Sequence, residues 1–255
     1  MTIEIATVPC LADNYAYLIH NHTENTTCLI DAPEATPIIG YLEKRAWNLD
    51  KIFLTHHHSD HVAGLGDLLK RYPANVSGAT ADVNRLPSLD AELKENDKFY
   101  LGTIEFSVME VYGHTIGHIA LYSKKISAVF SGDSLMTLGC GRLFEGNPEM
   151  MWKTLQKFSR LPPETKIYSG HEYGEKNANF AISVDPDNKK LQDRVAQIKK
   201  LRLNNFPSVP STIGAELETN PFLRAGNAEL KKFLGLSQDE DAAVLAELRS
   251  RRDIF

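Results

Sequence analysis

Cysteine is scarce in this sequence, and long apolar runs are absent from it. Three cysteines occur among 255 residues, Cys10, Cys28 and Cys140, and such an odd, widely spaced set does not form the disulfide framework of a small secreted protein. No stretch approaches the roughly 18 apolar residues of a membrane span. The N-terminal segment also lacks the basic region and apolar core of a signal peptide. We therefore expect a cytoplasmic protein with reduced thiols and no membrane partner.

An excess of basic residues is also missing. The 28 lysines and arginines are outnumbered by 33 aspartates and glutamates, which gives a formal net charge of -5. Broad binding to nucleic acid or to an anionic membrane needs a basic surface, so neither partner is expected. A local basic pocket remains compatible with this charge. The apolar fraction of 42% and the charged fraction of 24% are ordinary for a soluble globular protein.

The first two thirds of the chain mix strand-like and helix-like segments. Apolar or alternating runs rich in Val, Ile, Tyr and Phe predict strands at 2–8, 15–21, 26–32, 51–55, 104–112, 119–125, 127–132 and 166–170. Apolar residues at helical spacing predict helices at 35–46, 61–72 and 148–161. This mixture indicates a layered α/β domain, which we assign to residues 1–173.

The pattern changes after Tyr173, where strand-like runs stop. Helical spacing continues at 186–205, 228–235 and 237–253, the last with Ser237 as its expected N-cap. A proline-rich connector, 206–226, separates the first two of these segments. We therefore predict a smaller α-helical domain over residues 174–255.

Four of the nine histidines are crowded into the stretch THHHSDH, residues 55–61. His56 and His58 follow an apolar strand two residues apart, so in extended backbone they point to the same side, and His57 points to the other. Asp60 and His61 come where the next helix begins. A solvated loop rarely has this spacing, and the stretch predicts a metal site.

Three later segments repeat the same order of an apolar strand, a glycine and a metal-capable side chain. They end in Gly113-His114, Gly132-Asp133 and Gly170-His171. Sites in open α/β folds lie at the ends of strands, and glycine lets the backbone turn there. The candidate ligands are therefore His56, His58, Asp60, His61, His114, Asp133 and His171.

Seven ligands are too many for one tetrahedral zinc and suit two divalent ions that share a ligand. Asp133 is the predicted bridge, because a carboxylate has two oxygens. Imidazole and carboxylate ligands fit Zn²⁺ first, with Fe and Mn as alternatives. Taken singly, His114 or His171 would be read as an ordinary surface or core histidine, and Asp133 as a turn residue.

For each of three further polar residues, the sequence allows two roles. His57 and His118 either support a ligand from outside or have a structural role. Asp31, which closes the segment 26–32, either orients a ligand or simply ends a strand. Cys140 is a rival nucleophile, but it lies in a loop and the metal cluster already accounts for catalysis.

The pattern of these residues resembles that of the metallo-β-lactamase superfamily. The stretch THHHSDH matches the T-H-x-H-x-D-H signature of that superfamily. That resemblance implies an αββα sandwich with a binuclear site at one edge. More specific motifs resemble the glyoxalase II family, the hydroxyacylglutathione hydrolases. They are DNYAYLI (13–19), GHTIGH (113–118), CGRLFEG (140–146), GHEYG (170–174), NPFLR (220–224) and LRSRRDIF (248–255). The resemblance thus covers nearly the whole chain, and it implies a catalytic domain over residues 1–173 and a smaller C-terminal α-helical domain over 174–255 that binds the substrate.

The resemblance also implies roles for individual residues. His56, His58 and His114 would hold one ion, Asp60, His61 and His171 the other, and Asp133 would bridge them. The residues that match the family's glutathione-binding positions are Arg142, Phe144, Tyr173, Arg249 and Arg252. Three positions depart from the family pattern: Phe144 lacks the hydroxyl of a tyrosine, Arg252 replaces a lysine, and Gly174 stands where threonine is common.

The expected activity is hydrolysis of S-D-lactoylglutathione and related 2-hydroxyacyl-glutathione thioesters by a metal-bridging hydroxide, the second step of methylglyoxal detoxification. Asp60 and Asp133 are the expected catalytic residues. The products would be glutathione and a 2-hydroxy acid such as D-lactate, and the protein would act as a monomer. The alternative is another binuclear metallohydrolase such as a lactonase, which would share every metal ligand. A nuclease is disfavoured by the acidic charge, and an iron-dependent sulfur oxygenase by the complete second ligand set.

Overall fold

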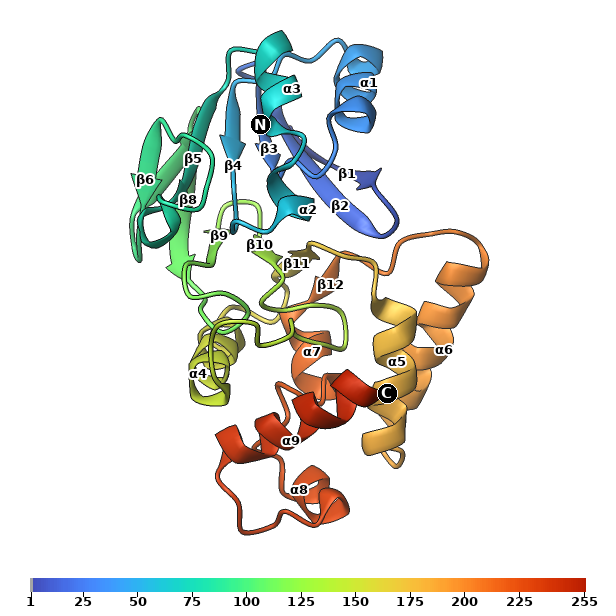
Figure 1. The fold of residues 1–255 in the computed structure, drawn as a ribbon. Coiled ribbons are helices and arrows are strands. Elements are labelled where there is room, and N and C mark those ends of the chain that lie inside the picture. Colours follow the sequence, from blue (N-terminus) through green and yellow to red (C-terminus); the bar gives the residue numbers. More distant parts are fainter. Residues whose placement is uncertain (1) are drawn as a thin grey trace. The chain divides into compact units, whose positions relative to one another are not determined.

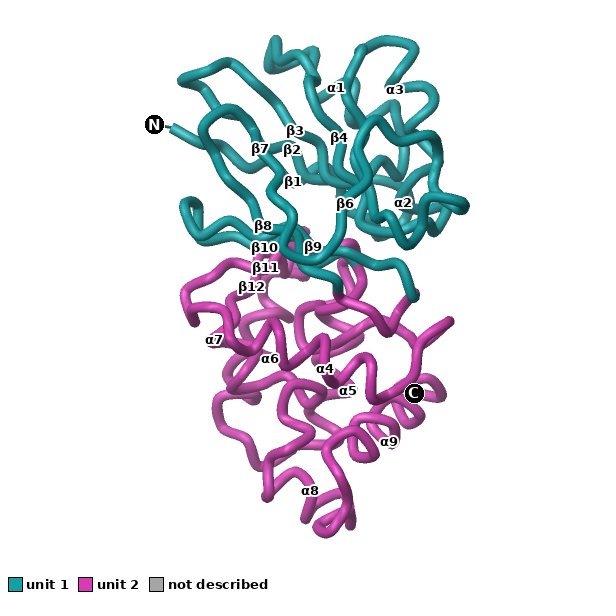
Figure 2. The backbone as a smooth tube through the Cα atoms, turned by 90° about the vertical axis from the view of Figure 1, so that its left-hand side faces the viewer, with its two compact units in different colours: residues 1–110, 116–132 teal, residues 111–115, 133–255 magenta. Residues whose placement is uncertain are grey.

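The computed structural model describes residues 2–255, which divide into two compact units (Figure 1, Figure 2). Unit 1 extends to residue 110 and includes 116–132, and unit 2 comprises 111–115 and 133–255. The segment 133–173 therefore belongs to the same unit as the C-terminal helices. The predicted boundary at residue 174 does not coincide with this division, and as a boundary between a catalytic and a substrate-binding domain it stays a prediction.

Unit 1 contains two sheets. The first has six strands in sequence order, β1 to β6, of which β1, β2 and β3 are antiparallel and β3 to β6 are parallel. Its strands are β1 (Ile3–Cys10), β2 (Asn14–Asn21), β3 (Thr26–Ile30), β4 (Lys51–Phe53), β5 (Asn75–Ala79) and β6 (Ala91–Leu93). The second sheet contributes β7 (Lys98–Leu101), β8 (Ile104–Glu110), β9 (Ile119–Ser123) and β10 (Ala128–Gly132), paired antiparallel in this order.

The first sheet of unit 1 is covered on both faces, because successive side chains of a strand alternate between them. On β4, Ile52 joins the core formed with Ile38 of helix α1 (Ala35–Arg45) and Leu65 of α3 (Leu65–Arg71). Phe53 instead meets Phe99 of β7, with ring centroids 5.7 Å apart. Each such side chain contributes about 1.5–3 kcal/mol when buried. The predicted layered α/β class is confirmed.

Unit 2 is mainly helical. Its helices are α4 (Pro148–Ser159), α5 (Gly174–Val184), α6 (Lys189–Leu203), α7 (Ile213–Thr219), α8 (Ala228–Leu234) and α9 (Asp241–Ile254), with a short antiparallel pair, β11 (Lys166–Ser169) and β12 (Ser211–Thr212). Four of these helices begin at a side chain that accepts a backbone N–H bond: Asn147, Asn188, Thr212 and Asn227. Such caps stabilise a helix by about 1 kcal/mol each.

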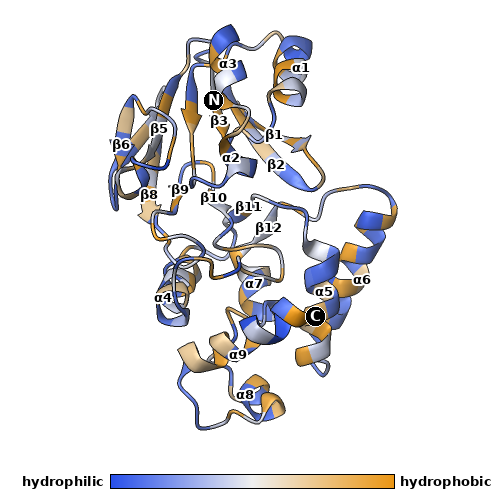
Figure 3. Cartoon of the chain, viewed as in Figure 1, coloured by the Kyte–Doolittle hydropathy of each residue, from blue (hydrophilic) through white to orange (hydrophobic). Residues whose placement is uncertain are grey.

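Helices α5 and α6 pack against each other through small and aliphatic residues. Ala178 and Ala181 of α5 let Leu191, Val195 and Ile198 of α6 approach closely. Figure 3 shows the ribbon of α6 as largely hydrophilic with some hydrophobic positions. The spacing of the three residues accounts for the helix that the sequence predicts here.

Several predicted elements need correction. The helix expected at 61–72 is split into α2 (Ser59–Val62) and α3, with Gly64 between them. The last helix begins after Glu240 instead of Ser237. The connector 206–226 contains α7 and β12, and the sequence pattern also missed α5, β5, β6 and β7. Across residues 2–255, none of the helices combines the length and the apolar character that crossing a bilayer requires.

Candidate metal centre and anion pocket

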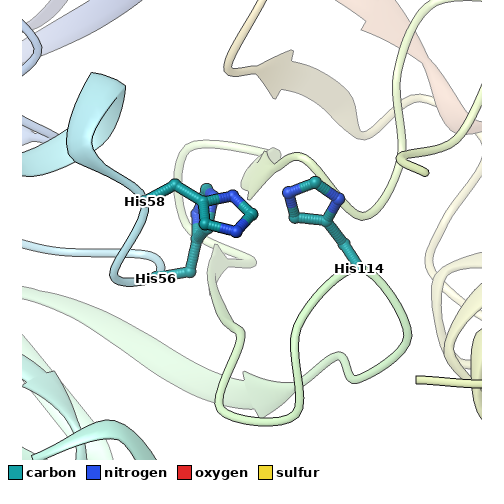
Figure 4. Close-up of side chains that lie close together, drawn as sticks. All are labelled: His56, His58 and His114. Carbon is teal, nitrogen blue, oxygen red and sulfur yellow. The ribbon is translucent and has the colours of Figure 1, made fainter. Parts of the chain in front are cut away.

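The histidine cluster of unit 1 lies between β4 and α3. Nε2 of His56 is 3.1 Å from Nδ1 of His58, and the ring centroids of His56 and His61 are 4.2 Å apart. Figure 4 shows His56 and His58 extending from one short stretch of backbone. His57 instead has Nδ1 3.0 Å from Oδ2 of Asp82. The predicted alternation along this stretch is therefore present, and it gathers imidazole nitrogens on one side.

A buried carboxylate supports the cluster from behind. Asp31 accepts the backbone N–H and the hydroxyl of Thr55, both at 2.8 Å, and its Oδ2 lies 2.8 Å from Nδ1 of His61. This contact places a proton on Nδ1 and leaves Nε2 of His61 available to a metal. Of the two interpretations of Asp31, the structure therefore favours the orienting one.

His118 packs flat against His56, with centroids 4.6 Å apart and ring planes 16° apart, and it is fully buried. This stacking fits a structural role. Asn14, to which sequence reasoning gave no role, donates its amide to the backbone oxygen and to Oδ2 of Asp60, at 3.0 and 3.1 Å. It thereby fixes the carboxylate of Asp60, and the motif DNYAYLI in which it stands was the available signal.

Unit 2 supplies the other three predicted ligands. Oδ2 of Asp133 lies 3.6 Å from Nε2 of His114 and 3.2 Å from Nε2 of His171. All three side chains are buried. One carboxylate oxygen therefore faces two imidazole nitrogens, and the bridging role of Asp133 stays a prediction.

Two glycines next to these ligands have backbone conformations that disfavour other residues. Gly113, with φ of +137°, precedes His114, and a Cβ there would lie 2.9 Å from the backbone of Met151. Gly132, with φ of +49°, ends β10, and a Cβ there would lie 2.6 Å from the ring of His118. Glycine has no Cβ, so it permits both turns. These contacts explain Gly113 and Gly132, two of the three glycines that recur before the predicted ligands.

The loop 136–142 of unit 2 contacts His114. Nδ1 of His114 is 2.8 Å from the backbone oxygen of Arg142. The amide of the buried Asn220 donates to the backbone oxygens of Met136 and Gly139, at 3.3 and 3.0 Å. The first residue of the motif NPFLR thus positions this loop.

The turn that carries His171 and Tyr173 is also fixed. Their rings are stacked, with centroids 4.7 Å apart and planes 6° apart. Between them, Glu172 accepts hydrogen bonds from the backbone N–H and the hydroxyl of Ser208, both at 2.6 Å, and from the N–H of Gly174 at 3.2 Å. Sequence reasoning missed Glu172 and Ser208.

A cavity of about 390 Å³ in unit 2 joins two of the predicted ligands to the predicted substrate-binding residues. We call it the anion pocket. Its lining includes His114 and Asp133 together with all five of Arg142, Phe144, Tyr173, Arg249 and Arg252, and also Met136, Cys140, Gly141, Lys176 and Asn177. A larger cavity of about 910 Å³ in the same unit is lined by both acidic and basic side chains and contains none of the predicted site residues.

The arginines of the anion pocket have different partners. Arg249 is buried and donates to the backbone oxygen of Cys140 at 2.8 Å and to Oδ1 of Asp253. Arg252 donates to the neutral Oδ1 of Asn177 at 3.2 and 3.3 Å. Partial burial, and next the positive charge of Arg249, lower the pKa of Arg252 from its usual value. This crowding of positive charge favours binding of an anion.

Cys140 lines the same pocket, but its environment argues against a nucleophilic role. Burial raises the pKa of its thiol to about 11, which outweighs the opposing effect of the Arg249 cation. The thiolate is the reactive form, so it is almost absent at neutral pH. All three cysteines are free, as the sequence predicted.

The donor atoms at both places suit divalent metal ions. They are imidazole nitrogens and carboxylate oxygens, the ligand types of zinc, iron and manganese centres. Each of the seven predicted ligands belongs to a group of donors that could hold a metal ion, and among residues 2–255 no other side chain does.

Comparison with known families gives two matches along the chain. The metallo-β-lactamase superfamily matches residues 12–171, and the hydroxyacylglutathione hydrolase C-terminus matches residues 172–255. A protein of Ruegeria pomeroyi named hydroxyacylglutathione hydrolase is 52% identical, and one of the same name from Cereibacter sphaeroides is 53% identical. Both alignments cover 100% of this chain and 100% of the relative.

Solved structures of other proteins have the same fold. A B3 metallo-β-lactamase, BLEG-1, has a TM-score of 0.68 at 22% identity, over 86% of this chain and 99% of that one. ETHE1 from Myxococcus xanthus has a TM-score of 0.67 at 24% identity, over 100% of this chain and 99% of that one. The predicted metallo-β-lactamase fold with a C-terminal helical domain is confirmed. The chain belongs to the hydroxyacylglutathione hydrolase (glyoxalase II) family of thioester hydrolases, within the metallo-β-lactamase superfamily.

Proposed function

We propose that this protein hydrolyses S-D-lactoylglutathione and related 2-hydroxyacyl-glutathione thioesters to glutathione and a 2-hydroxy acid. The observation that carries the proposal is the anion pocket, in which two predicted metal ligands share one cavity with three arginines. Two full-length relatives that are 52% and 53% identical have the corresponding name. The lactonase alternative is not favoured, because a lactone without carboxylates would leave the arginines unused.

We propose that the seven predicted ligands hold two divalent ions, with Zn²⁺ as the first choice and Fe or Mn as alternatives. His56, His58 and His114 would hold one ion, Asp60, His61 and His171 the other, and Asp133 would be shared. Ions of this kind lower the pKa of water to about 7 and polarise a carbonyl oxygen.

The surrounding residues keep these ligands in the required protonation state and orientation. Asp31 would keep the proton of His61 on Nδ1, and the backbone oxygen of Arg142 would do the same for His114. Asp60, held by Asn14 and partly exposed, is placed to orient the attacking water or to accept its proton. The leaving thiol has a pKa of about 8.5, so its thiolate departs without a strong general acid.

The anion pocket would bind the glutathione part of the substrate. Glutathione has two carboxylates, and charge-assisted bonds from Arg142, Arg249 and Arg252 suit them. The ring of Tyr173 would contribute a wall and a hydroxyl. Phe144, 60% exposed and edge-on to His114 at 5.4 Å, would contribute apolar contact only, because it lacks a hydroxyl.

We propose as well that the protein acts as a monomer in the cytoplasm, in the second step of methylglyoxal detoxification. This setting follows from the substrate, since S-D-lactoylglutathione would be supplied by the first step of that route. The acidic net charge of -5 gives no support to a nucleic-acid or membrane partner.

Steady-state hydrolysis of S-D-lactoylglutathione by metal-loaded protein tests the proposal, with a simple acyl-lactone as the comparison substrate. The expected result is rapid turnover of the thioester and little turnover of the lactone. Turnover of the lactone without the thioester would leave the metal centre intact and refute the glutathione assignment.

A further inference from the structure

One carboxylate oxygen engages two arginines of the anion pocket. Oδ1 of Asp253 accepts from Nε of Arg142 at 3.1 Å, and from Nε and Nη2 of Arg249 at 3.2 and 2.9 Å. Arg142 comes from the loop after β10, whereas Arg249 and Asp253 lie one turn apart on α9. The negative charge of Asp253 opposes binding of an anion in the adjacent pocket. A favourable effect of Asp253 on the pocket has to offset this cost.

The contacts of Asp253 fix both guanidinium groups. Arg249 also donates to the backbone oxygen of Cys140 at 2.8 Å and lies over the ring of Phe222, 5.2 Å from its centroid. The side chain of Arg142 is 55% exposed, and its Nε donates to Oδ1 of Asp253. That bond restricts the guanidinium while its terminal nitrogens keep their N–H groups for a ligand. An arginine loses rotamer freedom when a ligand orders it, so presetting the side chain strengthens binding.

We propose that Asp253 is a positioning residue of the anion pocket, which presets Arg142 and Arg249 to receive a carboxylate of the glutathione part of the substrate. The inference rests on the proposed function. It separates these two arginines from Arg252, which donates hydrogen bonds to the neutral Asn177 and not to Asp253.

The substitution Asp253→Ala removes the acceptor oxygens together with the charge, and it distinguishes positioning from simple charge compensation because the two roles change KM in opposite directions. If Asp253 positions the arginines, KM for S-D-lactoylglutathione rises about tenfold while kcat stays within about twofold. If Asp253 merely lowers the positive charge of the pocket, its removal strengthens anion binding and KM falls.

Two controls complete the experiment. Glu247 forms another ion pair on α9, in which its carboxylate lies 2.8 Å from Nε of Arg251, and it does not line the anion pocket. The substitution Glu247→Gln is therefore expected to leave KM unchanged. The second control is the S-D-lactoyl thioester of N-acetylcysteamine, a thiol without carboxylates, on which Asp253→Ala is expected to have no effect.

The proposal is supported by a rise in KM that is confined to the glutathione thioester. It is overturned by an unchanged or lower KM, or by an equal loss of activity on both thioesters, which a general structural role would produce. Failure of the wild-type protein to hydrolyse S-D-lactoylglutathione would instead refute the proposed function, and this inference with it.

Discussion

The histidine cluster of unit 1 and the anion pocket of unit 2 are constructed differently. The histidines are close in sequence, and His56 and His61 are buried and supported by polar contacts in the core. The arginines of the pocket come from two segments more than a hundred residues apart, and Arg142 is largely exposed. Their partners are Asp253, Asn177 and backbone oxygens.

This difference follows from what each place has to do. Metal ligands need a fixed protonation state and geometry, which burial and a supporting carboxylate provide. Substrate anchors must exchange their partners for a ligand, so they have to stay accessible and keep N–H groups for it. The comparison therefore predicts that substitutions in the first group change metal content, and that those in the second change KM.

The largest expected effect is on the metal side. Asp133→Ala removes the oxygen that faces both His114 and His171, so the protein should lose bound metal and kcat should fall by about a thousandfold or more. Elemental analysis and kinetics measure both quantities. Asp239→Ala, on an exposed turn of the same unit, serves as the control; normal metal content in Asp133→Ala would contradict the ligand assignment.

On the pocket side, Arg252→Ala should raise KM for S-D-lactoylglutathione by about 10- to 100-fold with little change in kcat, because it removes charge-assisted bonds that persist through the reaction. Arg251→Ala is the matched control, since Arg251 is the neighbour of Arg252 in sequence but pairs with Glu247 outside the pocket. A fall in kcat with unchanged KM would place Arg252 in the chemistry and break the comparison.

A residue behind the metal ligands should affect metal affinity without touching substrate. Asp31→Asn is expected to weaken metal binding by about 10- to 100-fold, because His61 loses the partner that fixes its Nδ1 proton. Competition with a chelator measures this affinity. Asp82→Asn alters the partner of His57 instead, and equal effects of the two substitutions would deny Asp31 its orienting role.

The smallest effect concerns the backbone next to the ligands. Gly132→Ala should lower the free energy of unfolding by about 1–3 kcal/mol, since φ is +49° and the new Cβ would meet His118. Gly40→Ala, within α1 and with nothing inside 4 Å of the new Cβ, should instead stabilise the protein by about 0.5–1 kcal/mol. Chemical denaturation compares them, and equal stabilities would show that the turn at Gly132 is adaptable.

The histidine cluster and the anion pocket also differ in how far the sequence predicts them. The spacing of His56, His58 and His61 is local, so the sequence indicates a metal site without any reference to folding. The glycines that precede His114 and Asp133 have a physical cause in the backbone, because Gly113 and Gly132 both adopt positive φ angles. The substrate-binding residues were named only through the family resemblance, because no local pattern links Arg142 to Arg249.

The supporting residues could not be predicted, because their partners are distant in sequence. Asn14 bonds Asp60 across 46 positions, and Arg142 bonds Asp253 across 111. The missed helix α7 is different, since Thr212 caps it through the N–H of Ala215 at 3.2 Å, and that signal was present in the sequence. The prolines of the preceding segment obscured it.

The most direct test of the division between the two places is the ratio of kcat/KM for two thioesters of the same acyl group. One is S-D-lactoylglutathione and the other is the carboxylate-free S-D-lactoyl-N-acetylcysteamine. If the metal centre performs the chemistry and the anion pocket selects the thiol part, the ratio should exceed about a hundred, with the difference mainly in KM. Equal kcat/KM values for the two substrates would contradict the account.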